Sequence, residues 1–329
     1  AALNAIALVQ KMVASDTGAH IDSISPHTLR MIQATENYIL LFPNGKSYNE
    51  VVMNMGSIYF NNKQYNEAIS TYQIITKRGK PGPKYYNAGF LISKCFFGKE
   101  EWLKAAGGFE KVWKEASDEF LRQEAFKLLL QSKFLYAEQL LKTGDYNKAA
   151  LEYRNIDRKY PGSEYGDITL FNSAEAFEKQ EDWLQSCRTY FELYQKYPLS
   201  KLAPDALFNA ASNYEKIKRY NKSADMYELI IDNYPNSTKA KDALFNVGFS
   251  YEKLGKFDKL AESNELYSKL YPGEKDVELM LFRSAEFYFK SSNFQKSITL
   301  YKNYITRYPK SSRTVEAYYK IGKCYYKNN

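Results

Sequence analysis

The chain has 329 residues, with 46 Lys and Arg against 38 Asp and Glu, which gives a formal net charge of +8. Hydrophobic residues make up 44% of it, ample for a core. No apolar run approaches about 18 residues, which excludes a membrane-spanning helix.

Residues 1–47 are expected to form a degenerate opening pair of helices. Apolar residues at helical spacing mark the first one: Leu3, Ile6, Val9 and Val13. Ser25-Pro26 then predicts the N-cap and first residue of a second helix, which ends near Leu41. The chain starts inside a helix without a Met, so we expect a processed or excised piece. A lipid anchor or a peripheral membrane attachment would then belong to a missing N-terminal segment.

From about residue 48 the sequence repeats itself. Asp205–Pro235 returns 37 residues later as Asp242–Pro272, and a closing Tyr-Pro pair keeps the same period. The pairs are Tyr160-Pro161, Tyr197-Pro198, Tyr234-Pro235, Tyr271-Pro272 and Tyr308-Pro309. Each unit predicts two helices. Gly255 is placed for the left-handed residue that ends the first helix, and Pro272 ends the second. Ser200, Ser237 and Ser311 follow the Tyr-Pro pairs, where a helix N-cap is expected.

One position of each first helix is usually small, and an aromatic residue usually stands three places later. The small series is Gly56, Ser93, Ala137, Ala174, Ala211, Gly248, Ala285 and Gly322. A small residue lets two helices approach closely while a neighbouring aromatic ring fills the space beside the contact. The alternation therefore predicts packed helical hairpins.

The period breaks once, between Trp102 and Tyr146, where the spacing is 44. Seven extra residues are nearly two helical turns, so the helix around Leu121–Lys142 can lengthen, keep its buried face and project beyond its neighbours. The last helix, Thr314–Lys327, has no partner, so either it caps the solenoid or the chain was cut inside a longer array; Gly322 and Tyr325 resemble pairing residues and favour the cut. We expect one solenoid domain over 1–329, with regular units in 48–313 and an unpaired helix in 314–329.

This order of small residues, aromatics, turns and prolines resembles the tetratricopeptide repeat (TPR), whose usual length is 34 residues. The three extra residues and the Tyr-Pro-x-Ser junction resemble the TPR units of envelope proteins of Gram-negative bacteria, such as the outer-membrane lipoprotein of β-barrel assembly and the Tol–Pal coordinator. The resemblance implies an all-α, right-handed superhelical α-solenoid. It also implies a non-enzymatic protein-interaction scaffold in the periplasm or at the outer membrane.

Motifs for chemistry are absent. Gly45-Lys46-Ser47 lacks the leading glycine and the preceding strand of a phosphate loop. The two histidines, His20 and His27, have no metal-ligand spacing. Cys95, Cys187 and Cys324 show no CxxC pattern and are expected to be buried apolar residues. We therefore expect no catalytic activity, no cofactor and no metal ion.

The candidate site is the face of each first helix that lies away from the core stripe, which in TPR proteins lines the concave groove. One position there is aromatic in nearly every unit, and acidic residues flank it. The predicted partner-binding residues are Phe134, Phe171, Phe208, Phe245, Phe249, Phe282, Glu138, Glu175, Glu178, Glu215, Glu252 and Glu286. They favour a partner protein or peptide with apolar and basic side chains. The alternative is that the aromatic series packs against the neighbouring first helix and stiffens the superhelix.

The positive charge also admits an RNA- or anionic-surface-binding protein. Many basic residues, however, are expected at helix C-termini and turns, where they complement the helix dipole: Arg158-Lys159, Lys196, Lys216, Lys218-Arg219 and Lys222. Nucleic acid is therefore not the expected partner. A third alternative is a non-catalytic repeat region of a larger protein.

Overall fold

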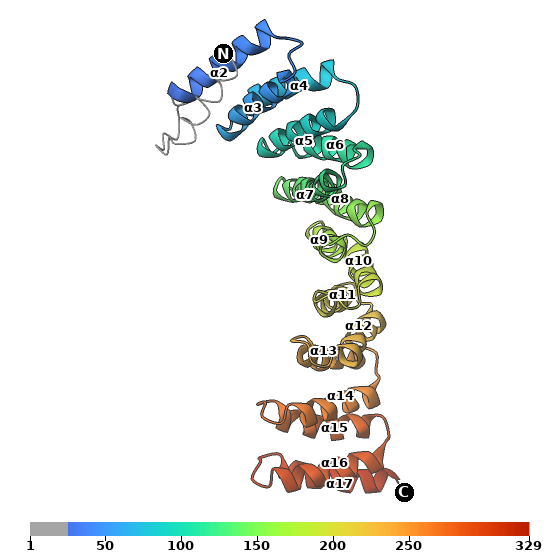
Figure 1. The fold of residues 1–329 in the computed structure, drawn as a ribbon. Coiled ribbons are helices and arrows are strands. Elements are labelled where there is room, and N and C mark those ends of the chain that lie inside the picture. The colour runs from blue at the N-terminus through green and yellow to red at the C-terminus, as the bar shows by residue number, and fades with distance from the viewer. Residues whose placement is uncertain (1–25, 329) are drawn as a thin grey trace. The chain divides into compact units, whose positions relative to one another are not determined.

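The structure is a computed structural model that describes residues 26–328. Over this range the chain is all-helical, with no strand. It divides into two compact units between Thr143 and Gly144, where the sequence predicts a single domain. The expected first helix, between Leu3 and Val13, lies outside the described residues. Figure 1 shows the helices within each unit following one another in chain order.

Unit 1 contains the described helices up to Thr143. They are α2 (Pro26–Leu41), α3 (Tyr48–Asn61), α4 (Tyr65–Arg78), α5 (Pro83–Gly98), α6 (Trp102–Glu115) and α7 (Glu119–Lys142). Each helix packs against the next along the chain, as expected of a solenoid. The second predicted helix of the opening pair, from Pro26 to Leu41, is confirmed.

Unit 2 continues from Gly144. Its helices are α8 (Tyr146–Lys159), α9 (Gly166–Lys179), α10 (Trp183–Lys196), α11 (Ala203–Lys216), α12 (Tyr220–Asn233), α13 (Ala240–Lys253), α14 (Phe257–Leu270), α15 (Val277–Lys290), α16 (Phe294–Arg307) and α17 (Thr314–Asn328). All but α17 have 14 residues, and the starts recur with the period of the sequence. Here too each helix packs against the next.

A residue with positive φ stands in the turn between the two helices of each hairpin. Gly255 adopts this conformation, with φ of +67°, as the sequence predicts. Most of the equivalent residues are not glycine: Lys63, Glu100, Glu181, Lys218 and Ser292. A side chain in the left-handed region costs about 1 kcal/mol, so the turn geometry is imposed by the helix packing rather than by local preference.

The small residue of each first helix lies where the paired helix comes closest. In α3 a Cβ on Gly56 would overlap the ring of Tyr72, which is fully buried in α4. In α13 a Cβ on Gly248 would stand 2.9 Å from Leu260 Cδ1 of α14. The core thus consists of repeated contacts between a small residue and a bulky one, as the alternation in the sequence indicates.

The helix α7 has 24 residues, which matches the lengthening expected around Leu121–Lys142. Asp118 caps it by accepting a hydrogen bond from the Leu121 amide at 2.9 Å. Its added turns still contact α6, because Phe126 lies 4.8 Å from the Trp113 ring and Arg122 donates to the Trp113 carbonyl at 2.9 Å. The added turns are therefore held by α6 rather than projecting freely.

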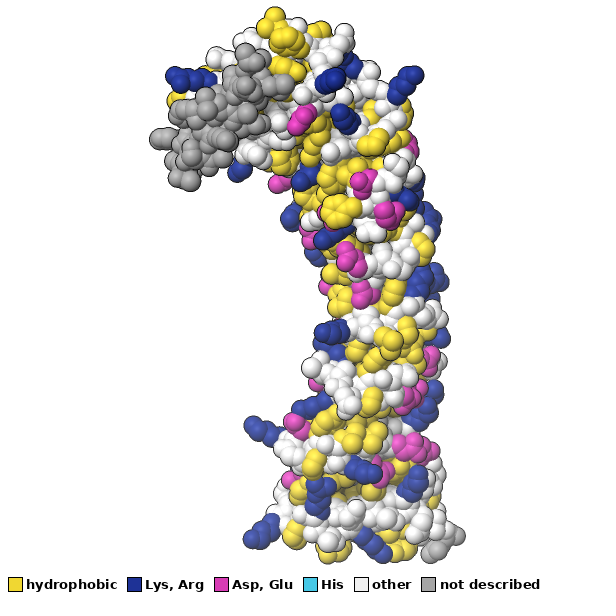
Figure 2. Space-filling view, viewed as in Figure 1, with side chains coloured by type: hydrophobic (Ala, Val, Ile, Leu, Met, Phe, Trp, Pro, Cys, Tyr) yellow, Lys and Arg dark blue, Asp and Glu magenta, His cyan; other side chains and the backbone are white. Residues whose placement is uncertain are grey.

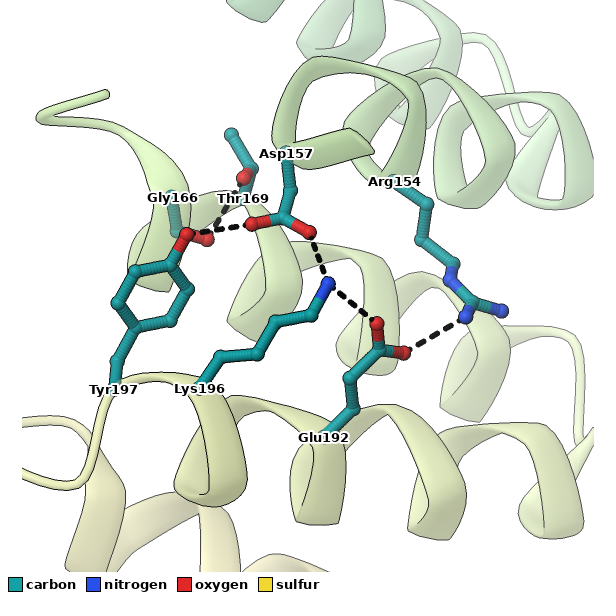
Figure 3. Close-up of polar contacts among 7 residues, drawn as sticks. All are labelled: Arg154, Asp157, Gly166, Thr169, Glu192, Lys196 and Tyr197. Carbon is teal, nitrogen blue, oxygen red and sulfur yellow. Dashed lines mark hydrogen bonds and ion pairs between the residues drawn. The ribbon is translucent and has the colours of Figure 1, made fainter. Parts of the chain in front are cut away.

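The Tyr-Pro junctions tie neighbouring hairpins together in unit 2. Tyr197 donates a hydrogen bond to the buried carboxylate of Asp157 in α8 at 2.6 Å, and Lys196 donates to the same carboxylate at 2.7 Å (Figure 3). Glu192 extends the network to Lys196 and Arg154. Burial, and then the hydrogen bond to Asp157, raises the pKa of Tyr197 to about 12. The junction tyrosine therefore stays protonated and acts as a donor.

The serines after these junctions do not serve as N-caps. Ser200 lies two residues before Leu202, the N-cap of α11, and accepts a hydrogen bond from the Leu202 amide at 3.0 Å. Its own hydroxyl donates to Asp167 of α9 at 2.5 Å. Ser311 accepts from the Arg313 amide in the same way. Ser200 and Ser311 therefore shape the loop that enters the helix, about two residues before the expected N-cap. The buried Ser237 hydroxyl has no hydrogen-bond partner in the described part of the chain.

Candidate functional site

The aromatic series of the first helices makes one repeated contact in unit 2. Each ring packs edge to face against a buried tyrosine in the second helix of its own hairpin. Phe171 lies 5.2 Å from Tyr190, Phe208 lies 5.5 Å from Tyr227, and Phe282 lies 5.4 Å from Tyr301. Part of the series therefore packs within the solenoid, against the second helix of its own hairpin.

Exposure separates the predicted aromatic residues. Phe282 is 3% exposed and offers a partner almost no surface. Phe171 and Phe208 are half-buried, as is Phe134, which lies in α7 of unit 1. On α13, by contrast, Phe245 and Phe249 are 49% and 44% exposed. The accessible aromatic surface among these residues is concentrated on one helix.

Two of the predicted acidic residues are used by internal hydrogen bonds. Glu178 accepts from Asn213, a buried residue of α11 that also donates to Ser186 at 3.1 Å. Glu215 occupies the same position one repeat later, and accepts from Ser223 at 3.1 Å and Ser250 at 3.3 Å. These bonds link consecutive hairpins. Both carboxylates are thus engaged in stabilising the array and are less available to a partner.

Burial raises the pKa of two of the predicted carboxyl groups, Glu215 and Glu175. It raises the pKa of Glu215, against the opposing effect of its hydrogen bonds from Ser223, Ser250 and Tyr227. Partial desolvation, followed by the charge of Glu178, raises the pKa of Glu175, although Glu175 is exposed overall. In both groups burial opposes ionisation of the carboxyl.

The remaining predicted acids lie in different settings. Glu286 forms an ion pair with Lys320 of α17 at 3.0 Å. Glu138 is half-buried in α7 of unit 1. Glu252 is exposed and lies beside Phe249 on the wall of a pocket. Of the acidic residues, Glu252 is the one that the structure combines with exposed aromatic surface.

This α13–α15 pocket is the candidate site. It encloses about 270 Å³ and is formed by α13, α14, α15 and the residue before α15. It brings three predicted residues together, Phe245, Phe249 and Glu252. The other lining residues are Asn246, Gly248, Leu260, Asn264, Asp276, Leu279, Met280, Arg283 and Phe287.

Several lining residues were not predicted from the sequence, above all Asn264 and Arg283. A signal for both was present, because each departs from its repeat. Tyr190, Tyr227 and Tyr301 occupy the position of Asn264, and Asn172, Asn209 and Asn246 occupy that of Arg283. Reading where a repeat breaks its own pattern would have indicated this pocket.

A second pocket lies in unit 1, between the start of α5 and the α6–α7 connection. It encloses about 430 Å³, and Phe90, of the same aromatic series, is among its lining residues together with Leu91 and Phe120. Phe120 is 75% exposed. The charged residues on its wall are Lys84 and Asp118.

The basic residues are largely placed as expected. Arg158 and Lys159 lie in the last turn of α8, Lys196 in that of α10 and Lys216 in that of α11. Lys222 lies instead in the first turn of α12, where it pairs with Asp225 at 3.4 Å. On the face shown in Figure 2, basic, acidic and hydrophobic side chains are intermixed.

The three cysteines are buried and unpaired with one another, as predicted for small apolar residues. Burial raises the pKa of the Cys95 thiol to about 11 and that of Cys187 to about 12, so neither is a reactive thiolate near neutral pH. Among residues 26–328, no group of three His, Cys, Asp or Glu side chains could hold a metal ion. Nor does any helix in that range have the length and apolar character needed to cross a bilayer.

Comparison with protein families recognises tetratricopeptide repeats in both units. One tetratricopeptide repeat model matches residues 205–237 and 280–311, and a second matches residues 50–73. A search of curated protein sequences finds no significant match.

Solved structures with similar folds include helical-repeat proteins at low identity. One is Naa15/Naa10 bound to HypK-THB, at 12% identity and a TM-score of 0.43; the alignment covers 95% of this chain and 43% of that one. Another is a putative kinesin light chain with TPR-like repeats from Podosopora anserina, at 10% identity and a TM-score of 0.37; the alignment covers 56% of this chain and 97% of that one. A third is the C-terminal part of a TPR repeat-containing protein from Cytophaga hutchinsonii, at 14% identity and a TM-score of 0.38; the alignment covers 80% of this chain and 98% of that one.

Proposed function

We propose that this chain is a non-catalytic scaffold that binds a partner protein or peptide on the ladder face of unit 2, with α13 as the principal contact. By ladder face we mean the face of the first helices that carries Phe171, Phe208, Phe245 and Phe282. The observation that carries the proposal is the exposure of Phe245 and Phe249 beside a pocket. Stacked repeats commonly use such extended surfaces for binding.

The chemistry of the pocket wall indicates what such a partner presents. Phe245, Phe249 and Phe287 supply aromatic surface, and aromatic anchors dominate affinity in many interfaces. Glu252 and Asp276 stand at the same wall and favour a basic segment nearby, while Arg283 supplies a positive charge. We therefore expect an apolar or aromatic anchor flanked by mixed charges.

We further propose that the scaffold works in a bacterial cell-envelope complex, in the periplasm or at the outer membrane. The 37-residue period and the Tyr-Pro-x-Ser junctions support this placement through their resemblance to envelope TPR units. A lipid anchor would lie in a segment before residue 1. Fractionation of cells that produce the full-length protein tests the placement, and recovery in the cytoplasmic fraction would contradict it.

The binding proposal is tested by substitution at the exposed aromatics. Partners captured from the native cells by the full-length protein are identified, purified and titrated by calorimetry. Phe249→Ala and Phe245→Ala should each weaken binding by about 1–3 kcal/mol, because each removes an anchor from the pocket wall. Leu199→Ala is the matched control, since Leu199 is 98% exposed in a loop away from the pocket and should leave affinity unchanged.

Phe282→Ala separates packing from binding. Its ring is buried against Tyr301 and Tyr304, so its truncation should cost about 3–5 kcal/mol of folding stability. If the α13 variants fold normally and bind every purified partner like the parent, the scaffold proposal fails for this face. Salt-dependent binding of RNA by the parent would instead support the nucleic-acid alternative.

A further inference from the structure

In three hairpins of unit 2 the second helix carries a tyrosine that acts as a structural plug. Tyr190, Tyr227 and Tyr301 are at most 1% exposed, and each ring meets the phenylalanine of its own first helix edge to face. We call the space that this ring occupies the aromatic slot.

For Tyr190 and Tyr227 the hydroxyl at the end of the slot has two kinds of partner, whereas the buried Tyr301 hydroxyl has no hydrogen-bond partner among the described residues. Asn209 of the next first helix donates to the Tyr190 hydroxyl at 3.2 Å, and Glu178 of the same hairpin also hydrogen-bonds to it. One repeat later the Tyr227 hydroxyl has the equivalent partners, Asn246 and Glu215. A carboxylate and a nitrogen donor thus hold each of these phenols.

In the α13–α14 hairpin the plug is missing. The position equivalent to Tyr227 is Asn264, so no ring from α14 fills the slot at that point. Phe245, the phenylalanine of this hairpin, meets Tyr267 at 6.0 Å and remains 49% exposed, whereas Phe282 in the next hairpin is 3% exposed. The α13–α15 pocket includes Asn264 and Phe245 on its wall. The missing ring thus accounts for both the exposure and the pocket.

The two positions that hold the tyrosine hydroxyl still carry suitable groups. Glu252 is equivalent to Glu215, and Arg283 is equivalent to Asn246; both line the pocket. A phenol in the slot would therefore meet a carboxylate acceptor and a guanidinium donor, the same pair of functions that holds Tyr190 and Tyr227.

The residues next to the Glu252 carboxylate in the pocket differ from those next to Glu215 one repeat earlier. Glu215 receives hydrogen bonds from Ser223 and Ser250. The residues equivalent to these serines in the next repeat are Leu260 and Phe287, which have no donor and line the pocket. Phe287 is held by a stacked contact with Phe257 at 6.1 Å. The slot thus combines an apolar floor with a carboxylate that these two neighbours cannot satisfy.

We propose that the α13–α15 pocket receives a tyrosine side chain from the partner, which completes the aromatic slot in place of the missing ring of α14. The inference rests on the scaffold function proposed above and names the anchor that it recognises. A volume of about 270 Å³ suits one side chain, since apolar cavities of about 150 Å³ accept benzene. The incoming hydroxyl donates to Glu252 and accepts from Arg283.

The test uses the full chain with ¹³C-methyl methionine. The sequence contains six methionines, and Met280 lines the pocket, so its methyl signal reports occupancy while the others serve as internal references. The probes are N-acetyl-tyrosinamide, N-acetyl-phenylalaninamide and N-acetyl-leucinamide. We expect a saturable Met280 shift with the tyrosine probe, which should bind about two- to tenfold more tightly than the phenylalanine probe because of the hydroxyl contacts.

Two variants at one position provide the control. Asn264→Tyr restores the ring found in the neighbouring repeats and should abolish the Met280 shift without lowering the melting temperature. Asn264→Ala removes the same side chain but leaves the slot open, so it should still bind the tyrosine probe. If Asn264→Tyr does not fold, the parent and Asn264→Ala with the three probes still decide the outcome. Equal shifts with the tyrosine and leucine probes would overturn the proposal.

The purified partner distinguishes failure of this inference from failure of the scaffold proposal. Loss of partner binding in Asn264→Tyr, together with loss of the probe shift, supports the inference. A parent without a Met280 shift, or a partner that binds Asn264→Tyr as tightly as the parent, overturns the inference and leaves the scaffold standing. Partners that are insensitive to Phe245→Ala and Phe249→Ala overturn the scaffold proposal, whatever the probe does.

Discussion

At the residue scale, equivalent positions of a repeat can have opposite roles. Glu178, Glu215 and Glu252 stand 37 residues apart on successive first helices. The first two accept hydrogen bonds from the next hairpin, and the third is exposed at a pocket. What changes is the pair of residues facing the carboxylate, which are donors in the first two cases and Leu260 and Phe287 in the third. The role of such an acid is therefore set by its neighbours.

Glu215→Gln tests this reading through the pH dependence of stability. Burial raises the pKa of Glu215 in the folded chain above its ordinary value of 4.5. This group costs no folding stability below pH 4.5; the penalty grows as pH rises from 4.5 towards the raised pKa and is complete above it. At pH 7.5 the variant should be more stable by about 1.4 kcal/mol for each pH unit of that shift. Thermal melts from pH 7.5 to 5 should show the gap closing.

Glu252→Gln provides the matched control for that experiment. It makes the same chemical change one repeat later, where the side chain is exposed and its neighbours at the equivalent positions are apolar. It should leave the melting temperature unchanged across the same range. A Glu215→Gln variant that is less stable than the parent at every pH would mean that the hydrogen bonds outweigh the cost of burial.

At the element scale, the small position shows how one register gives different packing along the array. Three of its residues are glycines: Gly56, Gly248 and Gly322. An added methyl would enter the Tyr72 ring at Gly56, stand 2.9 Å from the flexible end of Leu260 at Gly248, and meet nothing within 4 Å at Gly322. The small position therefore lies at a tight helix crossing in α3, at a less tight crossing in α13 and on an uncovered helix face in α17.

The three Gly→Ala variants should therefore rank in that order. Gly56→Ala should destabilise unit 1 by about 1–3 kcal/mol through overpacking. Gly248→Ala should be close to neutral, because the Leu260 side chain can move. Gly322→Ala should stabilise α17 by up to about 1 kcal/mol, since alanine favours a helix and meets no neighbour there. Circular dichroism melts rank the three, and equal effects would refute the assigned helix crossings.

The same series shows how far the sequence could predict the structure. The sequence predicted the first regular unit from about residue 48, where α3 begins, because apolar spacing and Tyr-Pro breaks act locally. Period alone could not show that Phe282 is buried while Phe245 is exposed. That difference depends on contacts between helices, because Phe282 packs against Tyr301 and Tyr304. Phe245 packs against Tyr267, and the position equivalent to Tyr301 in its hairpin is Asn264. The candidate site was accordingly predicted as a face, and the structure narrows it to one hairpin and its neighbour.

At the scale of the whole molecule, two units in which each helix packs on the next should respond locally to damage. The core residues of unit 2 include a cluster that runs from Leu170 in α9 to Tyr288 in α15. Tyr72, whose ring lies against Gly56, belongs to a separate cluster in unit 1. A destabilising change at Gly56 should therefore act chiefly on unit 1. Because stability in such arrays is close to a sum of neighbouring terms, distant repeats should be affected little.

The tryptophans allow each unit to be followed separately. Trp102 and Trp113 lie in α6 of unit 1 and Trp183 lies in α10 of unit 2. Trp183→Phe leaves reporters in unit 1, and the double variant Trp102→Phe, Trp113→Phe leaves one in unit 2. With Gly56→Ala added, the urea midpoint of the unit 1 reporters should fall by about 1 M, given typical denaturant slopes. The Trp183 midpoint should stay unchanged, and Gly248→Leu, placed in unit 2, should reverse the pattern by overpacking against Leu260. Equal shifts of both reporters in either variant would show that the chain unfolds as one cooperative block.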